Sequence, residues 1–308
     1  MPVVPMRYVP VMRFRPLGHT GLNTSVIGLG TWQLGGEWGI DFTQAQVDAI
    51  LDAAAECGVN LIDTAECYGD HLSERLLGDY LARHDRSRWI VATKFGHLFD
   101  GFLKRRDEFS VAGVRTQLEA SLRALRLEKI DLYQFHSGAD LSFNNDELWT
   151  YLADQKRAGK VGHLGVSLNK TTEHQADWAK QRGIEVIQVV HNRLDRRAES
   201  LHFPFAARDG LGILARVPLA SGLLTGKFKP GVTFPANDVR ARVTPEAMQR
   251  DLDEVARIGR EEVPPGVPMA HWAMAWCLKN PLVSAVIPGC KNADQVRDNA
   301  EAADLIPA

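Results

Sequence analysis

The stretch IDLYQFHSGADLSFNNDELWTYLADQKRAGKVGHLGVS, residues 130–167, contains one complete strand–helix–strand unit. Residues 130–135 and 161–166 are short apolar runs with β-branched side chains, which are typical of buried strands. Between them, the apolar residues of 146–160 recur every three or four positions, as in an amphipathic helix. A strand, a covering helix and a second strand in this order predict two parallel strands of one sheet.

Units of the same kind repeat along the chain, which has 308 residues. Helical segments such as 44–58 and 110–127 alternate with further apolar runs. Eight such units predict an α/β fold, the closed (β/α)8 TIM barrel, with an open doubly wound sheet as the structural alternative. The eight candidate strands are residues 26–29, 59–62, 89–93, 130–135, 161–166, 186–190, 212–217 and 283–287.

The remaining segments lie outside the eight strand–helix units of the predicted barrel. In residues 12–30, apolar and polar side chains alternate around a glycine-containing turn, which predicts an N-terminal β-hairpin. Residues 97–109 and 222–247 are insertions after the third and seventh strands, so we expect long loops at the C-terminal face, where barrel enzymes build their sites. We predict an N-terminal tail at residues 1–11 and a single barrel domain over residues 12–308.

Composition argues against several classes of partner. The 36 Lys and Arg residues against 38 Asp and Glu residues give a formal net charge of −2, which offers no general attraction to nucleic acid or to an anionic membrane. No apolar stretch approaches the length of a membrane span or of a signal peptide. The four cysteines form no CxxC pair, and we interpret them as reduced thiols. We therefore expect a cytoplasmic protein.

The sequence does not match three common kinds of binding site. The glycine-rich segment GLGTWQLGG, residues 28–36, has Gln33 where a dinucleotide fingerprint requires glycine. The segment SGLLTGKF is one residue too short for a phosphate-binding P-loop, and Phe228 replaces the required hydroxyl residue. The ten histidines are scattered, so we predict no metal site.

Four ionisable residues fall at or just after the ends of predicted strands. Asp63 ends NLID, Tyr68 follows it in ECYGD, Lys94 ends WIVATK and His136 ends DLYQFH. In a barrel these neighbouring strand ends converge. Taken singly, Asp63 also suits a turn former, Tyr68 a packed surface aromatic and His136 a hydrogen-bonded strand end. Lys94 also suits a Schiff-base nucleophile.

Together the four residues suit acid–base chemistry on a carbonyl group. A lysine in an apolar strand is costly to bury without a carboxylate, which makes Asp63 the natural partner of Lys94. A free phenol titrates near pH ~10, and a nearby ammonium stabilises the phenolate that remains after Tyr68 gives up its proton. His136 then donates a hydrogen bond to the carbonyl oxygen. A hydride donor is the missing component.

The motifs DTAECYG, VATKFG and DLYQFH, in this order, resemble those of the aldo-keto reductase superfamily, in particular the bacterial NADPH-dependent members. The resemblance runs over nearly the whole chain from about Met12. It implies a (β/α)8 barrel without a Rossmann domain, which binds a nicotinamide dinucleotide across its C-terminal face and reduces an aldehyde or ketone to the alcohol. It also implies that Tyr68 is the general acid and that Asp63, Lys94 and His136 are its catalytic partners.

The resemblance further implies a set of cofactor contacts. The implied contacts are Gly30, Thr31 and Trp32 at the nicotinamide ribose, Ser167 and Gln188 at the carboxamide, Leu219, Ser221, Gly222, Leu224 and Lys227 at the pyrophosphate, and Gly289, Lys291, Gln295 and Asn299 at the adenosine. A helix start beside Lys291 suits a 2′-phosphate, so NADP(H) is preferred over NAD(H). A structural turn around Gly222 and a solvated surface charge at Lys291 are the alternative interpretations.

Two positions depart from the pattern of the superfamily. Leu168 stands where many relatives have Asn, and the adjacent Asn169 is a candidate substitute at the carboxamide. Arg216 stands where relatives usually have the Tyr or Trp that stacks on the nicotinamide. Because a guanidinium repels the cationic oxidised ring, we hypothesise that Arg216 weakens NADP⁺ relative to NADPH. An Arg216 that turns away to pair with an acidic residue is the alternative.

Two other functions suit the same fold. One is a cofactor-binding regulatory or redox-sensor subunit with little turnover, like the potassium-channel β subunits, and the other is a Schiff-base lyase that uses Lys94. The predicted partner is a small-molecule carbonyl substrate, and a homo-oligomer is compatible with the sequence. Side chains in and beside the loops suit an apolar-walled pocket for a polar or anionic carbonyl. These side chains are Trp32, Trp38, Phe99, Phe102, Arg105, Arg106, Arg240 and Arg242.

Overall fold

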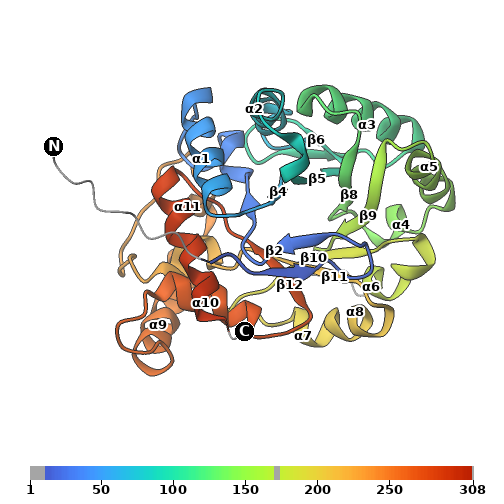
Figure 1. Ribbon diagram of the computed structural model, residues 1–308. Coiled ribbons are helices and arrows are strands. Elements are labelled where there is room, and N and C mark those ends of the chain that lie inside the picture. The colour runs from blue at the N-terminus through green and yellow to red at the C-terminus, as the bar shows by residue number, and fades with distance from the viewer. Residues whose placement is uncertain (1–10, 170–173, 307–308) are drawn as a thin grey trace.

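A parallel sheet of eight strands forms the centre of the computed structural model, which describes residues 11–169 and 174–306 (Figure 1). Neighbours in the sheet follow the order β12-β11-β10-β9-β8-β5-β4-β3. Parallel bridges Ile27↔Val286 and Gly30↔Gly289 join its two edges and close the barrel. The strands are β3 (Leu29–Gly30), β4 (Leu61–Asp63), β5 (Ile90–Phe95), β8 (Ile130–His136), β9 (Val161–Ser167), β10 (Val186–Val190), β11 (Gly212–Arg216) and β12 (Val283–Ile287). The predicted (β/α)8 barrel is confirmed.

Helices surround the barrel and begin where the sequence supplies a cap. Thr43 forms a capping box with Gln46 at the start of α1, and Ser110 accepts a hydrogen bond from the backbone of Gly113 at the start of α3. The α-helices are α1 (Gln44–Glu56), α2 (Leu72–Leu81), α3 (Val111–Leu125), α4 (Asp140–Phe143), α5 (Asp146–Arg157), α6 (Gln175–Trp178), α7 (Ala198–Leu201), α8 (Phe203–Asp209), α9 (Pro245–Glu261), α10 (Met269–Leu278) and α11 (Ala293–Ala300).

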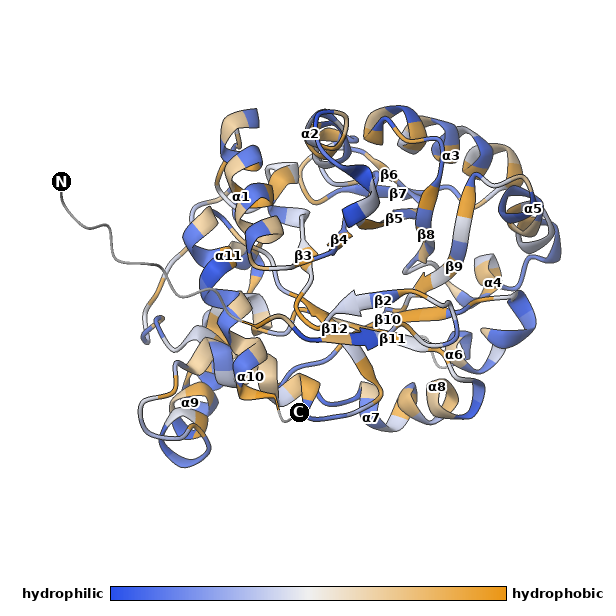
Figure 2. Ribbon diagram, viewed as in Figure 1, coloured by the Kyte–Doolittle hydropathy of each residue, from blue (hydrophilic) through white to orange (hydrophobic). Residues whose placement is uncertain are grey.

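Short 3-10 helices complete the connections. They are η1 (Trp32–Gly35), η2 (Arg86–Arg88), η3 (Lys180–Arg182), η4 (Ala220–Thr225), η5 (Val239–Arg242) and η6 (Glu301–Leu305). Apolar residues concentrate along the strands, and polar residues lie mainly on the outer helices and loops (Figure 2). This is the pattern expected when helices cover a buried parallel sheet.

The N-terminal hairpin closes the bottom of the barrel. β1 (Phe14–Pro16) pairs antiparallel with β2 (Asn23–Ser25), which confirms the predicted hairpin. Leu17 in its turn is fully buried and packs in a cluster with strand residues such as Leu61 and Leu214. The predicted tail at residues 1–11 lies outside the described residues except for Val11, and its boundary stays a prediction.

The loops at the opposite end of the barrel form the functional face. The first predicted insertion contains a second hairpin, β6 (His97–Phe99) with β7 (Arg105–Asp107). The second insertion contains η4 and η5 and leads into α9. The parallel register places Asp63 beside Gly30, and Lys94 beside Gln134, at this end of the sheet. All of these features therefore surround one opening of the barrel.

Candidate active site

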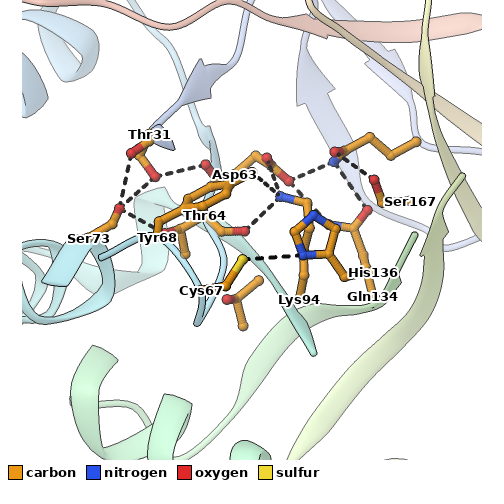
Figure 3. A network of polar contacts seen from close by, with 12 residues as sticks. Thr31, Asp63, Thr64, Cys67, Tyr68, Ser73, Lys94, Gln134, His136 and Ser167 are labelled. Carbon is orange, nitrogen blue, oxygen red and sulfur yellow. Dashed lines mark hydrogen bonds and ion pairs between the residues drawn. The ribbon is translucent and has the colours of Figure 1, made fainter. Parts of the chain in front are cut away.

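Short polar contacts link three of the four predicted catalytic residues at the C-terminal face, and the fourth, His136, lies beside them (Figure 3). The Lys94 Nζ donates to Asp63 Oδ2 at 2.7 Å and to the backbone oxygen of Thr64 at 2.8 Å. The same ammonium lies 3.3 Å from the hydroxyl oxygen of Tyr68. The ring of His136 meets the Tyr68 ring edge-on, with 6.2 Å between centroids. The structure therefore brings together all four residues from three different strands and the loop after β4.

Lys94 is a charged group held entirely inside the protein. Its side chain is 0% exposed, so the carboxylate of Asp63 is the group that balances its charge. Burial alone lowers the pKa of Lys94, but the nearby Asp63 and Tyr68 outweigh burial and raise it. Asp63 is held in turn by two amides, since Gln188 Nε2 donates at 2.7 Å and Gln134 Nε2 at 3.2 Å to its other oxygen. Lys94 is consequently an ammonium at neutral pH.

Tyr68 is positioned by a tight turn against the loop after β3. A Cβ atom added at Gly35 would lie 2.6 Å from the carbonyl carbon of Tyr68, so only glycine allows this approach. The Trp32 ring stacks near the Tyr68 ring at 6.1 Å with an angle of 23°. Burial raises the pKa of the Tyr68 phenol above its usual value, while the Lys94 ammonium opposes part of that rise. Tyr68 is therefore a protonated phenol with a cation ready to stabilise its phenolate.

His136 is a neutral imidazole with one nitrogen already engaged. Burial, and then the positive charge of Lys94, hold the pKa of His136 well below its usual range. Cys67 Sγ lies 3.7 Å from His136 Nδ1, and burial raises the pKa of this thiol to about 11, which keeps it protonated. A protonated thiol can donate to Nδ1, and this contact favours the tautomer that carries its proton on Nε2. His136 can then donate from Nε2 to an oxygen in the cavity.

A cavity of about 860 Å³ extends from this group of residues across the face of the barrel. Lys94 lies beneath its floor. Most of the predicted site residues line it: Gly30, Thr31, Trp32, Asp63, Tyr68, His136, Gln188, Arg216, Leu219, Ser221, Gly222, Lys227, Gly289, Lys291, Gln295 and Asn299. A cavity of this size is large enough for a cofactor and a small substrate.

Three predicted cofactor contacts do not line this cavity. Leu224 is fully buried in an apolar cluster with residues of α9 and α10. Ser167 is buried at the end of β9, where its hydroxyl donates to Gln188 Oε1 at 3.3 Å. Asn169 donates to the backbone oxygen of Ser137 at 3.4 Å and, like Leu168, borders a separate small pocket. Ser167 thus contacts Gln188, which lines the cavity, and Asn169 lies outside the cavity lining.

Three positively charged side chains in the cavity lining lie within electrostatic reach of one another. They are Lys227, Arg240 and Lys291. The Asp238 carboxylate accepts two hydrogen bonds from Arg240, at 2.9 and 2.6 Å, and so balances one of the three charges. Lys291 Nζ donates to the backbone oxygen of Trp38 at 3.1 Å, and burial lowers its pKa. A phosphate group here would meet three cations, of which Lys227 and Lys291 form no ion pair with any residue that the structure describes.

Arg216 faces the cavity rather than an acidic partner. Its Nη2 donates to the backbone oxygen of Leu168 at 3.0 Å, and its buried Nε has no hydrogen-bond partner within residues 11–169 and 174–306. No carboxylate among these residues forms an ion pair with it, so the described residues do not show the pairing that the alternative interpretation requires. Burial lowers the pKa of Arg216, whereas Tyr68, Asp63 and Asp195 oppose this effect, so the guanidinium lies within electrostatic reach of Tyr68 and Asp63.

Glu37 was not predicted from the sequence, yet its carboxylate joins the loops over the cavity. It is 1% exposed and accepts hydrogen bonds from Trp32 Nε1 at 2.7 Å, the backbone of Leu103 at 2.8 Å and Arg105 Nη2 at 2.6 Å. The backbone oxygen of Glu37 also accepts from Val239 at 3.1 Å. We call this set of contacts the Glu37 clasp. It ties the loop after β3 to the β6–β7 hairpin and to the loop after β11.

Comparison with known proteins agrees with this arrangement. The model of the Aldo/keto reductase family matches residues 26–307. The chain belongs to the aldo/keto reductase family. This aldo/keto reductase is 34% identical to the uncharacterized oxidoreductase YrpG of Bacillus subtilis, over 96% of this chain and 92% of that protein.

Two further relatives span nearly the whole aldo/keto reductase chain. The NADH-specific methylglyoxal reductase of Escherichia coli is 29% identical, over 96% of this chain and 94% of that protein. The holo form of the aldo-keto reductase AKR11C1 from Bacillus halodurans superposes with a TM-score of 0.81 at 29% identity, over 97% of this chain and 93% of that chain. The resemblance seen in the sequence is therefore confirmed. In the described part of this aldo/keto reductase, no helix has the length and apolar character needed to cross a membrane.

Proposed function

We propose that the protein is an NAD(P)H-dependent oxidoreductase that reduces an aldehyde or ketone to the alcohol, with Tyr68 as general acid. The observation that carries this proposal is the contact between the Tyr68 hydroxyl and the Lys94 ammonium, which Asp63 holds in place at the floor of a large cavity. A phenol beside a buried ammonium is a proton donor whose conjugate base is stabilised. Reduction of a carbonyl requires such a donor.

Each catalytic side chain has a separate task in this proposal. Tyr68 gives its proton to the carbonyl oxygen and becomes a phenolate, which the Lys94 ammonium stabilises. His136 donates a hydrogen bond from Nε2 to the same oxygen and so favours the charge that develops there. Asp63 keeps Lys94 charged and oriented, and it touches neither the substrate nor the transferred proton.

The lining of the cavity fits a nicotinamide dinucleotide. Lys227, Arg240 and Lys291 would hold phosphate groups, Gly222 leaves room for them, and Gln188 would face the nicotinamide end near Tyr68. When bound, the reduced cofactor supplies the hydride. The start of α11 beside Lys291 supports a preference for NADP(H), because a helix N-terminus and a cation together favour a 2′-phosphate. We propose NADP(H) over NAD(H) on this basis, in a cytoplasmic enzyme that acts on a small carbonyl compound.

The Glu37 clasp supports a second candidate function, a cofactor-binding regulatory or redox-sensor subunit with little turnover. Loops fastened over a cavity slow the release of whatever lies beneath them. The third candidate, a Schiff-base lyase, requires a neutral Lys94 amine. The ion pair with Asp63 and the raised pKa of Lys94 argue against it.

A screen that measures consumption of the reduced cofactor distinguishes the three candidate functions. Purified protein is mixed with NADPH or NADH and with sets of sugars, 2-oxoaldehydes, aromatic aldehydes and ketones, and absorbance of the reduced cofactor is followed. The proposed enzyme turns over at least one set and prefers NADPH. Tight cofactor binding with no turnover across all sets would favour the regulatory subunit. Borohydride trapping of Lys94 on a carbonyl compound would favour the lyase.

A further inference from the structure

The guanidinium of Arg216, which forms no ion pair within residues 11–169 and 174–306, has no role in the proton chemistry described above. It lines the same end of the cavity as Tyr68 and His136, and it contributes to the electrostatic environment of both. A buried cation without a carboxylate partner raises the electrostatic potential of the space that it faces. Its hydrogen bond to the Leu168 oxygen fixes the guanidinium in that place.

We propose that Arg216 selects the redox state of the bound cofactor, making the site bind reduced nicotinamide dinucleotide more tightly than the oxidised form. This inference rests on the proposed function, since it requires the reacting end of a nicotinamide to lie near Tyr68. The two redox forms differ by one positive charge on that ring. A fixed cation nearby therefore disfavours the oxidised form and leaves the reduced form almost unaffected.

The size of the effect follows from Coulomb's law. At an effective dielectric constant of about 20, a unit charge about 8 Å from another changes a binding constant about 30-fold. Lys94 is close to the same place, but Asp63 balances its charge at 2.7 Å. Among the described residues, Arg216 is thus the cation near Tyr68 that no carboxylate pairs, and we expect it to contribute at least about a tenfold preference.

The functional consequence concerns which cofactor occupies the site, not the overall equilibrium of the reaction. In a mixed pool the enzyme loads the reduced form, and the oxidised form leaves readily after reduction of the substrate. The reverse reaction is slow because the oxidised form of the cofactor binds weakly. Each tenfold preference also raises the reduction potential of the bound two-electron couple by about 30 mV.

The test measures dissociation constants of NADPH and NADP⁺ by protein-fluorescence titration, without any turnover. Three variants are compared with the unmodified chain. Arg216→Gln removes the charge, Arg216→Lys keeps it without the planar group, and Arg123→Gln removes an exposed charge from the outer helix α3 as a matched control. Circular dichroism of each variant checks the fold.

We expect the unmodified chain to bind NADPH at least about tenfold more tightly than NADP⁺. Arg216→Gln should reduce this ratio about tenfold or more, mainly through tighter NADP⁺ binding, whereas Arg216→Lys and Arg123→Gln should keep most of it. The proposal is overturned by equal affinities in the unmodified chain, which needs no variant to fold. It is also overturned by equal weakening of both forms in Arg216→Gln, or by the same loss of preference in Arg216→Lys. Binding of neither cofactor would instead remove the proposed function, and this inference with it.

Discussion

Replacing Asp63 by Asn removes the carboxylate that balances the buried ammonium of Lys94. The two carboxylate oxygens of Asp63 serve different donors, one the Lys94 ammonium and the other the amides of Gln188 and Gln134. An asparagine can present its single oxygen to only one of these sides, so its NH₂ group must face a donor on the other. We expect the variant to lose about 3–5 kcal/mol of unfolding free energy, the usual cost of leaving a buried charge without its partner.

The charge-removing variant Lys94→Met should cost less, about 1–3 kcal/mol, because Asp63 keeps its two amide donors. The double variant should be at least about 2 kcal/mol more stable than the sum of the two single losses predicts. Asp48→Asn is the matched control, since Asp48 pairs with Arg83 at the surface and its loss should cost less than about 1 kcal/mol.

The loss in Asp63→Asn should also depend on pH. Without the carboxylate, burial should lower the pKa of Lys94 in the folded state below its unfolded value near ~10.4. The unfolded state then binds more protons, so the unfolding free energy of the variant rises as pH increases toward ~10. In the unmodified protein the pKa of Lys94 is raised, so its contribution is fully present at neutral pH and is lost only as pH rises through that folded value.

Urea unfolding followed by both fluorescence and circular dichroism measures these differences, and coincident transitions justify a single free energy. If the unfolding free energy of Asp63→Asn lies within about 1 kcal/mol of that of the unmodified chain, Lys94 is not a buried cation that depends on Asp63 for its charge balance. A deficit that stays constant between pH 7 and ~10 would refute it equally.

Three further predictions concern the cavity. Burial raises the pKa of Tyr68 and lowers that of His136. We therefore expect kcat for reduction to be constant between about pH 6.5 and 9 and to fall only as pH rises through the pKa of Tyr68. A change of kcat near neutral pH in a pH–rate profile would contradict Tyr68 as the proton donor. Lys291→Met should lower kcat/KM with NADPH about tenfold and change kcat/KM with NADH less than about threefold. Equal losses of kcat/KM with the two cofactors in steady-state assays would argue against a contact between Lys291 and the 2′-phosphate. Glu37→Gln loosens the Glu37 clasp and should speed cofactor dissociation about tenfold in stopped-flow displacement, and an unchanged rate would show that the clasp does not gate the cavity.

The barrel could be predicted from the sequence because its strands are buried on both faces. Runs such as 186–190 and 283–287 coincide with β10 and β12, since short runs rich in β-branched apolar residues are typical of strands buried on both faces. The four catalytic candidates could be predicted for a related reason. Each lies at or just after the end of such a run, and the parallel register brings those ends together.

The loops could not be predicted to the same depth. After β11, the backbone of Val217, Ala220, Ser221 and Gly222 adopts left-handed torsions. These torsions decide that Ser221 lines the cavity while Leu224 turns into the core. Glu37 finds partners more than 60 positions away in Leu103 and Arg105. No local sequence pattern predicts a contact between two loops that become neighbours only in the closed barrel.

Replacing Tyr68 by Phe tests the central claim most directly, because it removes one hydroxyl group and leaves the ring against Trp32. With the best carbonyl substrate from the screen and saturating NADPH, kcat should fall by about two to four orders of magnitude. The dissociation constant of NADPH should stay within about threefold, since the hydroxyl is not assigned to cofactor binding. Tyr151→Phe is the matched control, because the Tyr151 hydroxyl is buried on α5 without a hydrogen-bond partner in the described part of the chain, and kcat should not change. A Tyr68→Phe variant that retains full kcat would contradict the assignment of Tyr68 as the proton donor.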